Sequence, residues 1–481
     1  METSTSRFLA LADELLIEII SQVQDRQALC ALARTCGRLQ NLTEDFIYES
    51  LLIRNGDQAR SLAHLFASRR IRARAVHDLQ IRWPHTSEDG IEDIDPVLKD
   101  LTQLKHLRIE SPCCNDGPWI DQPDNPALAW TSGGKIDISG LFEIALSYER
   151  SLSASPLSNL QSLTLHSHGR GEESTRYELG EGAIIFLLPT LRYIMLSCFD
   201  LGMHEDFEEV LSRNPRYTNS YKTTALKTLI FEECNIHFES FETLLKLPKA
   251  LENLTVGERM YHTSDDVVPM GFRSNFLEFL GPQRTTLKHF KHVGGGRYWS
   301  HAHTLSLYKE DISFLSALET IELGPALGRK YITHPLSPTL RKLRFLMIFP
   351  GDLGLENNFF DHPFWSSTFK TSGHLHYIDL VFHRTQDDEF WSSFWRRESV
   401  NSIASKLRRQ NTELSIYQPK FCKKALIPPY MYGEEMPEEE LLFVSSSPNT
   451  FGNRFYELSE DSIGDDEGEV PVATADADEV E

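Results

Sequence analysis

A short apolar phrase, Leu-x-x-Leu-x-Leu with Ile, Val or Phe also accepted, recurs along most of this 481-residue chain. Its second and third apolar residues are two positions apart, which is the spacing of side chains on one face of a β-strand. Successive copies begin 22 to 56 residues apart. The copies are Val76-Leu79-Ile81, Leu104-Leu107-Ile109, Leu160-Leu163-Leu165, Leu191-Ile194-Leu196, Leu226-Leu229-Phe231, Leu251-Leu254-Val256, Leu318-Ile321-Leu323, Leu340-Leu343-Phe345 and Leu375-Ile378-Leu380, with Leu287-Phe290 as an incomplete copy. This recurrence predicts units that bury their apolar sides by stacking on their neighbours.

The segments between the copies favour helices, as in the stretch from Phe238 to Leu247. Each unit is therefore predicted to be a strand, a turn and a helix. The longest interval, between Leu104 and Leu160, contains either a degenerate copy or a long insertion around Pro112 to Lys135. Because a single copy is weak evidence, an irregular α/β domain without regular stacking is the alternative architecture.

The first 52 residues have a different periodicity, which predicts three short helices. Leu11, Leu15, Leu16, Ile19, Ile20 and Val23 recur at helical spacing; Leu29, Leu32, Ala33, Cys36 and Leu39 repeat the pattern, and Leu42, Phe46, Ile47 and Leu51 suggest a third helix. Three such helices cannot bury much apolar surface by themselves, so this segment is predicted to be a docking module. An ordinary helical hairpin within a larger α domain is the other interpretation.

The order of residues in this segment resembles the F-box. Leu11, Asp13, Glu14, Leu15, Leu16, Ile19, Val23, Leu29, Leu32, Cys36, Arg38 and Leu39 lie where that motif has its characteristic residue types. Ala12 departs from the family, which usually has proline there. Further along, the stretch from Leu226 to Ile236 completes the longer leucine-rich-repeat phrase with Cys234. The combination resembles fungal-type F-box proteins with degenerate leucine-rich repeats.

This resemblance implies an α/β chain with an F-box at 1–55, a linker helix at 56–75, an irregular leucine-rich-repeat solenoid at 76–420 that recognises the substrate, and an acidic, largely disordered tail at 421–481. It implies a non-enzymatic substrate receptor that joins a Skp-type adaptor and, through it, a cullin–RING ubiquitin ligase, in the cytoplasm, the nucleus or both. The implied adaptor-binding residues are Leu11, Leu15, Leu16, Ile19, Ile20, Val23, Leu29, Leu32, Cys36 and Leu39. A leucine-rich-repeat interaction scaffold without a ligase role is the alternative function.

The protein substrate is unknown, but two interruptions of the repeat contain residue types that often dominate binding energy. These candidates for substrate binding are Trp119, Trp130, Arg297, Tyr298 and Trp299. Insertions in a solenoid gather on one edge, often the binding edge. The competing interpretation is that these side chains pack back on the repeats and hold their own loops in place.

The net charge and the lack of known motifs reduce the number of function classes to consider. The chain has a net charge of −22, of which residues 434–481 carry −15, so nucleic acid is not expected as a partner. No apolar run is long enough for a membrane span, and no secretory signal is evident. The seven cysteines are scattered, which favours a reducing compartment. No nucleophile, phosphate-loop or metal motif occurs, so neither a catalytic site nor a cofactor nor a metal is expected.

Overall fold

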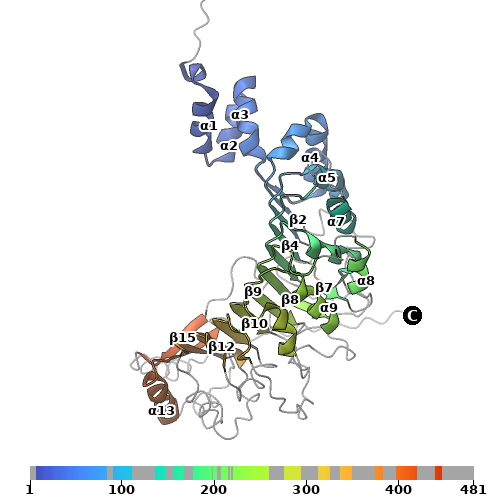
Figure 1. Cartoon of the computed structure of the whole chain (residues 1–481). Coiled ribbons are helices and arrows are strands. Elements are labelled where there is room, and N and C mark those ends of the chain that lie inside the picture. The colour runs from blue at the N-terminus through green and yellow to red at the C-terminus, as the bar shows by residue number, and fades with distance from the viewer. Residues whose placement is uncertain are drawn as a thin grey trace, which may run out of the picture.

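A computed structural model of the chain describes residues 7–83, 90–110, 136–147, 155–166, 177–197, 199–202, 207–214, 217, 220–258, 276–293, 312–324, 336–348, 374–382, 397–419 and 439–446. The fold is mixed α/β, with three helices at one end of a large sheet and further helices along one side of that sheet (Figure 1). The α/β class predicted from the sequence is confirmed.

The three helices at the N-terminal end are α1 (Asp13–Ser21), α2 (Arg26–Ala33) and α3 (Gly37–Tyr48), preceded by the 3-10 turn η1 (Arg7–Ala10). Here α1 to α3 are called the three-helix unit. The carboxylate of Asp25 accepts hydrogen bonds from the backbone N–H groups of Gln27 and Ala28, so it caps the start of α2. The unit has its own small core, whose buried members are Leu16, Ile20, Leu29 and Leu39.

The sheet follows the chain order. Its parallel strands are β1 (Ser50–Ile53), β2 (Asp78–Arg82), β3 (His106–Glu110), β4 (Ser162–His166), β6 (Tyr193–Ser197), β8 (Thr228–Ile236), β9 (Asn253–Glu258), β10 (His289–Val293), β11 (Thr320–Leu323), β12 (Lys342–Ile348), β13 (Tyr377–Phe382) and β14 (Glu413–Pro419). The last strand, β15 (Glu439–Val444), pairs antiparallel with β14. Two short strands, β5 (Tyr177–Glu178) and β7 (Phe199–Leu201), extend the sheet beside β8.

The repeated phrase fixes the register of these strands. The second apolar residue of every copy lies in one hydrogen-bonded row across the sheet, for example Leu163–Ile194–Leu229–Leu254. The third lies in a second row two residues later, and the first is buried just before the strand. Strand β3 pairs directly with β4, so no strand of the sheet lies between them and the long interval is an insertion. The helix α7 (Ile138–Ser147) lies in that insertion.

The incomplete copy has a structural explanation. His292 takes the place of the third apolar residue and is the register partner of Val256 and Leu323. It is fully buried, and its Nε2 lies 2.6 Å from Oε1 of Glu258, which is also buried. A buried polar pair with a short hydrogen bond therefore replaces an apolar side chain at this point of the row.

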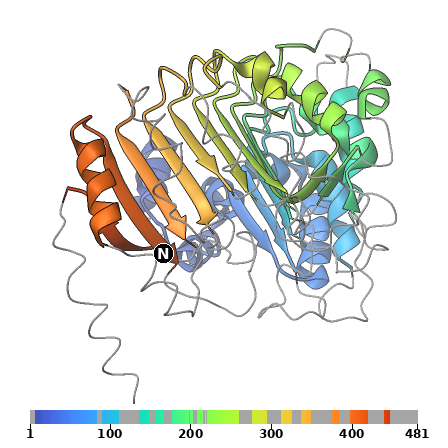
Figure 2. The same ribbon diagram turned by 90° about the horizontal axis from the view of Figure 1, so that it is seen from below.

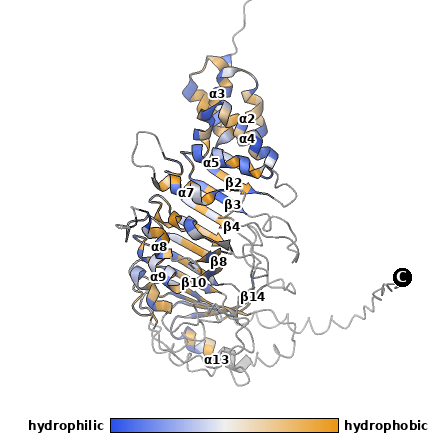
Figure 3. Cartoon of the chain, turned by 90° about the vertical axis from the view of Figure 1, so that its right-hand side faces the viewer, coloured by the Kyte–Doolittle hydropathy of each residue, from blue (hydrophilic) through white to orange (hydrophobic). Residues whose placement is uncertain are grey.

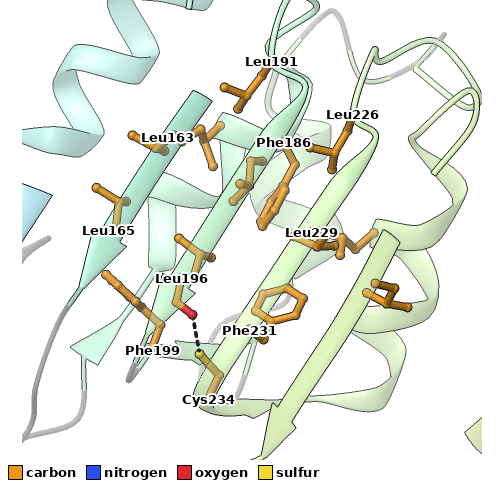
Figure 4. Close-up of a cluster of buried hydrophobic side chains, with 14 of the residues drawn as sticks. Leu163, Leu165, Phe186, Leu191, Leu196, Phe199, Leu226, Leu229, Phe231 and Cys234 are labelled. Atoms are coloured by element: carbon orange, nitrogen blue, oxygen red, sulfur yellow. Dashed lines mark hydrogen bonds between the residues drawn. The ribbon is translucent and has the colours of Figure 1, made fainter. Parts of the chain in front are cut away.

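The described helices lie along one side of the sheet (Figures 1 and 2). They are α4 (Gly56–Ser68), η2 (Arg70–Ala75), η4 (Ile91–Ile94), α5 (Asp95–Asp100), α7, η6 (Gly180–Leu187), α8 (Phe207–Ser212), α9 (Phe238–Lys246), η9 (Phe276–Gln283) and α13 (Arg397–Arg408). The apolar rows of the strands and the helices share one continuous core, which runs from Leu51 to Phe443. Figure 4 shows its middle, where Phe186 of η6 and Phe231 of β8 lie among leucines of neighbouring strands.

The boundary between the N-terminal helices and the sheet differs from the one expected from the sequence. Leu51 and Ile53, expected in the helical docking module, lie on β1 and pair with β2. Leu62 and Phe66 of α4, expected in a linker, are buried in the core of the sheet. The sheet therefore begins directly after α3.

The second difference lies near the C-terminus. Residues 439–444 fall in the segment expected to be largely disordered, yet they form β15, and Phe443 is buried in the core. Within an otherwise acidic segment, this stretch is apolar from Leu441 to Val444, and it forms a strand by pairing with β14 and burying Phe443. Residues 447–481 lie outside the described part of the chain.

Candidate functional site

The first candidate surface is the outer side of α1. Leu15, Ile17 and Ile19 are exposed by 54%, 41% and 45%, although each is a large apolar side chain. Their neighbours Leu16 and Ile20 are fully buried in the small core. Positions in an α-helix differ by 100°, so Leu15 and Ile19 lie together beside the core-facing stripe, and Ile17 lies on its other side. Leu15 and Ile19 thus form one exposed apolar pair, and exposed apolar groups that lie together are typical of a protein–protein contact.

The residues predicted to bind an adaptor fall into three groups. Leu15 and Ile19 are exposed, whereas Leu16, Ile20, Leu29 and Leu39 are buried inside the three-helix unit. The others, which pack partly buried against that core, are Leu11, Val23, Leu32 and Cys36. The buried four stabilise the unit and cannot touch a partner while it is folded. Ile17 was missed because it falls outside the helical periodicity that identified the others.

Arg38 fixes the start of α1 against the start of α3. Its guanidinium donates to Oδ1 of Asp13 at 2.9 and 2.6 Å and to the carbonyl oxygen of Leu11 at 2.7 Å. It also contacts the carbonyl oxygen of Leu9. Charge-assisted hydrogen bonds of this kind have fixed geometry, so they orient α1 and the apolar side chains that it carries.

A partly buried ion-pair cluster joins the three-helix unit to the rest of the chain. The carboxylate of Glu44 on α3 lies 2.9 Å from Nη1 of Arg69 and 2.8 Å from Nη2 of Arg72, and only 8% of its side chain is exposed. The hydrogen bonds that Arg72 donates to Glu44 raise the pKa of Arg72 above its usual value. The guanidinium of Arg72 also lies over the ring of Tyr48, which meets Phe66 of α4 edge to face. The orientation of the unit on the sheet is thus defined by several contacts.

The second candidate surface is the side of the sheet that the described helices do not cover, called here the open strand face. Side chains alternate along a strand, so residues between the two apolar rows point to this face. Figure 3 shows hydrophilic and hydrophobic residues in succession along β2, β3 and β4. The middle row of the open strand face contains Gln80, Arg108, Thr164, Met195, Ile230, Thr255, Lys291, Glu322, Arg344, Asp379 and Ser415.

One charged cluster lies at the N-terminal end of this face. Glu110 accepts from Nε of Arg82 at 2.7 Å and lies 2.8 Å from Nε of Arg108. Next to it, Nδ1 of His166 and Oγ of Ser197 are hydrogen-bonded at 2.7 Å. Burial, with Arg108 and Arg82 nearby, lowers the pKa of His166 to about 3. The imidazole is therefore neutral at physiological pH.

A second charged cluster lies near the other end of the face. Nζ of Lys342 is 2.8 Å from Oδ2 of Asp379, and the guanidinium of Arg344 lies 3.8 Å from the same oxygen. Arg344 also lies over the ring of Tyr417 and pairs with Glu439 of β15. Between the two clusters, burial raises the pKa of Glu232 to about 7, although Lys291 opposes this shift.

The predicted substrate-binding residues Trp119, Trp130, Arg297, Tyr298 and Trp299 lie outside the described residues. Within the described part of the chain, no group of three or more His, Cys, Asp or Glu side chains is arranged to hold a metal ion. Among the described helices, none combines the length and the apolar character that crossing a membrane requires.

The two surfaces differ in chemistry as well as in position. The outer side of α1 offers aliphatic side chains on a unit whose own core is complete. The open strand face carries charged clusters in which the carboxylates of Glu110 and Asp379 are buried and the cationic side chains are partly exposed. Comparison with models of known protein families gives no match, and comparison with curated proteins gives none either.

Proposed function

We propose that this chain is the substrate-recognition subunit of a Skp-cullin-F-box ubiquitin ligase. The three-helix unit acts as the F-box and binds a Skp-type adaptor, and the sheet is an irregular leucine-rich-repeat solenoid that holds a protein substrate. The observation that carries this proposal is the exposure of Leu15 and Ile19 on a unit whose core is already filled by other residues. Apolar groups in that position gain free energy only when a partner covers them.

Two further contacts support the assignment of the three-helix unit. Asp13 and Arg38, both at positions where the F-box has its characteristic residue types, form a hydrogen-bonded pair that links α1 to α3. Ala12 stands where the family usually has proline, and its φ is −64°, an angle that proline also adopts. The departure from the motif is therefore compatible with the same backbone.

The open strand face is the proposed substrate surface of the described residues. Its charged clusters hold Arg and Lys side chains in fixed positions, and Arg and Tyr are enriched among residues that dominate interfaces. The interruptions of the repeat that contain Trp119, Trp130 and residues 297–299 lie outside the described residues and remain proposed contributors. A partner with complementary charges and hydrogen-bonding groups suits this face better than an apolar ligand does.

The chain itself performs no chemistry in this proposal. Binding a substrate on the sheet and an adaptor on α1 raises the effective concentration of the substrate near the attached ligase, so that ubiquitin transfer becomes nearly intramolecular. The contacts of Glu44 with Arg69 and Arg72 serve this role because they hold the two binding surfaces in a constant relative position. We place the protein in the cytoplasm, the nucleus or both.

Capture of the adaptor from a cell extract tests the proposal. Leu15→Ala with Ile19→Ala should abolish capture of the adaptor and cullin without lowering the melting temperature, because both side chains are exposed. The matched control is Leu65→Ala, which removes a leucine on α4 that is 41% exposed, and this variant should capture both proteins normally. If the double variant captures them as well as the intact chain does, the α1 docking assignment is wrong. If the intact chain captures neither, the alternative of an interaction scaffold is favoured.

A further inference from the structure

The sheet ends in a strand that belongs to the acidic C-terminal segment. Strand β15 runs antiparallel to β14, and among the described residues it pairs with no other strand. Phe443 anchors it in the core of the sheet, and Glu439 anchors it on the open strand face by pairing with Arg344. The strand is therefore held in place from both faces, while its outer edge lies at the end of the sheet.

The register shows which backbone groups point to that outer edge. Ser445 donates its backbone N–H to the carbonyl oxygen of Leu414 at 2.9 Å, and Val444 is the register partner of Ser415. In an antiparallel pair, residues alternate between bonding to the partner strand and pointing away from it. The N–H and C=O groups of Val444 thus point away from β14, where an additional strand would lie.

The charges on this edge are negative only, at Glu439 and Glu440, and the β14–β15 pairing contains one bulge, between Ile416 and Tyr417. Natural edge strands are often protected by lysine or proline residues, and neither occurs from Glu439 to Val444. Leu441, on the same side of the sheet as Tyr417, is 48% exposed. A peptide that adds as a strand would form backbone hydrogen bonds along the edge and place alternate side chains on this apolar residue.

Charge identifies the kind of peptide. Five of the seven residues at 434–440 are glutamate, and the segment 434–481 carries a net charge of −15. Pairing between the β15 strands of two copies of this chain would bring these like charges together, so a second copy is disfavoured. A segment rich in lysine or arginine is attracted instead, and its association is steered by the same field.

We propose that the outer edge of β15 binds an extended, lysine- or arginine-rich segment of a partner protein as an additional strand of the sheet. This inference concerns the C-terminal edge alone, so it holds whether or not α1 binds an adaptor.

A peptide titration of the full-length chain tests this. The probe is a fluorescent eight-residue peptide of alternating lysine and valine, and the control peptide has glutamate in place of lysine. The lysine peptide should bind saturably and more weakly at high salt, and the glutamate peptide should not bind. Equal binding of the two peptides, or no binding of the lysine peptide, would overturn the proposal.

Variants locate the binding site. Val444→Pro removes an N–H that points to the outer edge and none that bonds to β14, so it should weaken the lysine peptide about tenfold. Ser446→Pro introduces the same residue just beyond the strand and should leave the affinity unchanged. Equal affinities for the two variants would overturn the proposal.

Hydrogen exchange gives a measurement that does not depend on the folding of a variant. In the unaltered chain, the lysine peptide should slow exchange of the Val444 amide, which lies at the outer edge. Saturable binding that leaves this amide unprotected would place the peptide elsewhere and overturn the inference, whatever the stability of the Val444→Pro variant.

Discussion

The three-helix unit and the sheet bury apolar side chains in opposite ways. The unit has four buried core residues and leaves Leu15, Ile17 and Ile19 of α1 exposed. The sheet places its regular rows of apolar residues in one continuous core and presents polar, charged residues on the open strand face. A small unit with exposed aliphatic groups suits a stable apolar interface, whereas a rigid polar face suits selective binding. The proposed division into adaptor docking and substrate recognition follows this difference.

The largest expected losses of stability come from substitutions inside the two cores. Phe231→Ala should lower the free energy of unfolding of the sheet by about 3–5 kcal/mol, because a fully buried ring is replaced by a cavity. Leu16→Ala should lower the free energy of unfolding of the three-helix unit by about 2–5 kcal/mol. Calorimetry should show the sheet transition shifted in the first variant and kept in the second. A sheet transition that falls equally in both variants would mean that the two cores unfold as one.

The C-terminal strand gives the next largest effect. Phe443→Ala should lower the free energy of unfolding by about 3 kcal/mol, since Phe443 is only 1% exposed in the sheet core. Removing residues 447–481 should leave the melting temperature unchanged within about 2 °C, because β15 ends before them. Thermal unfolding of both variants checks this pair of expectations. A stable Phe443→Ala variant would show that β15 does not contribute to the sheet.

The raised pKa of Glu232, a residue of the open strand face, makes the stability of the sheet depend on pH. Burial raises its pKa from 4.5 to about 7, so the folded state holds a proton that the unfolded state releases between these values. Its contribution to stability is thus fully present below about pH 4.5 and is lost as the pH rises to about 7. Glu232→Gln should therefore be more stable than the unaltered chain at pH 8, by about 2–3 kcal/mol, with the advantage disappearing at pH 4.5. Urea unfolding of both proteins at the two pH values is the measurement; a constant difference would contradict the assignment.

The junction between the two regions is the next place to test. Glu44→Gln removes the carboxylate charge between Arg69 and Arg72 and should lower the free energy of unfolding by about 2 kcal/mol. This loss is smaller than the loss expected from breaking a fully buried ion pair, because Arg69 is partly exposed. Small-angle scattering should then report a wider range of orientations of the three-helix unit relative to the sheet. Glu18→Gln, on the exposed side of α1, is the control that should change neither quantity. An unchanged scattering profile for Glu44→Gln would mean that Tyr48 and Phe66 suffice to hold the junction.

The apolar rows of the sheet could be predicted from the sequence because one local spacing is repeated on each strand. The phrase missed β1 and β14 for identifiable reasons. Tyr48 occupies the first position of the phrase before β1, and Asn411, whose φ is 58°, occupies it before β14. Neither residue type is part of the phrase, although both strands continue the register.

The exposed side of α1 could not be predicted in the same way. Leu15, Leu16, Ile19 and Ile20 cover a wide apolar arc, and only the position of α3 decides which pair is buried. That position depends on contacts such as Arg38 with Asp13, whose partners are 25 residues apart. Periodicity within one helix contains no information about such distant pairs. The charged clusters of the open strand face were missed for the same reason, since strands far apart in the sequence bring them together.

The smallest expected effect concerns the residue at which α1 departs from the F-box pattern. Ala12 has a φ of −64°, which proline shares, and its backbone N–H donates no hydrogen bond within the described residues. Ala12→Pro should therefore stabilise the three-helix unit by about 0.4–1 kcal/mol, because proline restricts the unfolded chain more than the folded one. Leu16→Pro is the opposing control, since the N–H of Leu16 donates to the carbonyl oxygen of Ala12 at 3.1 Å. Guanidinium unfolding followed on the three-helix unit checks both. A destabilised Ala12→Pro variant would mean that the backbone before α1 differs from that of the F-box, and the resemblance would lose one of its structural supports.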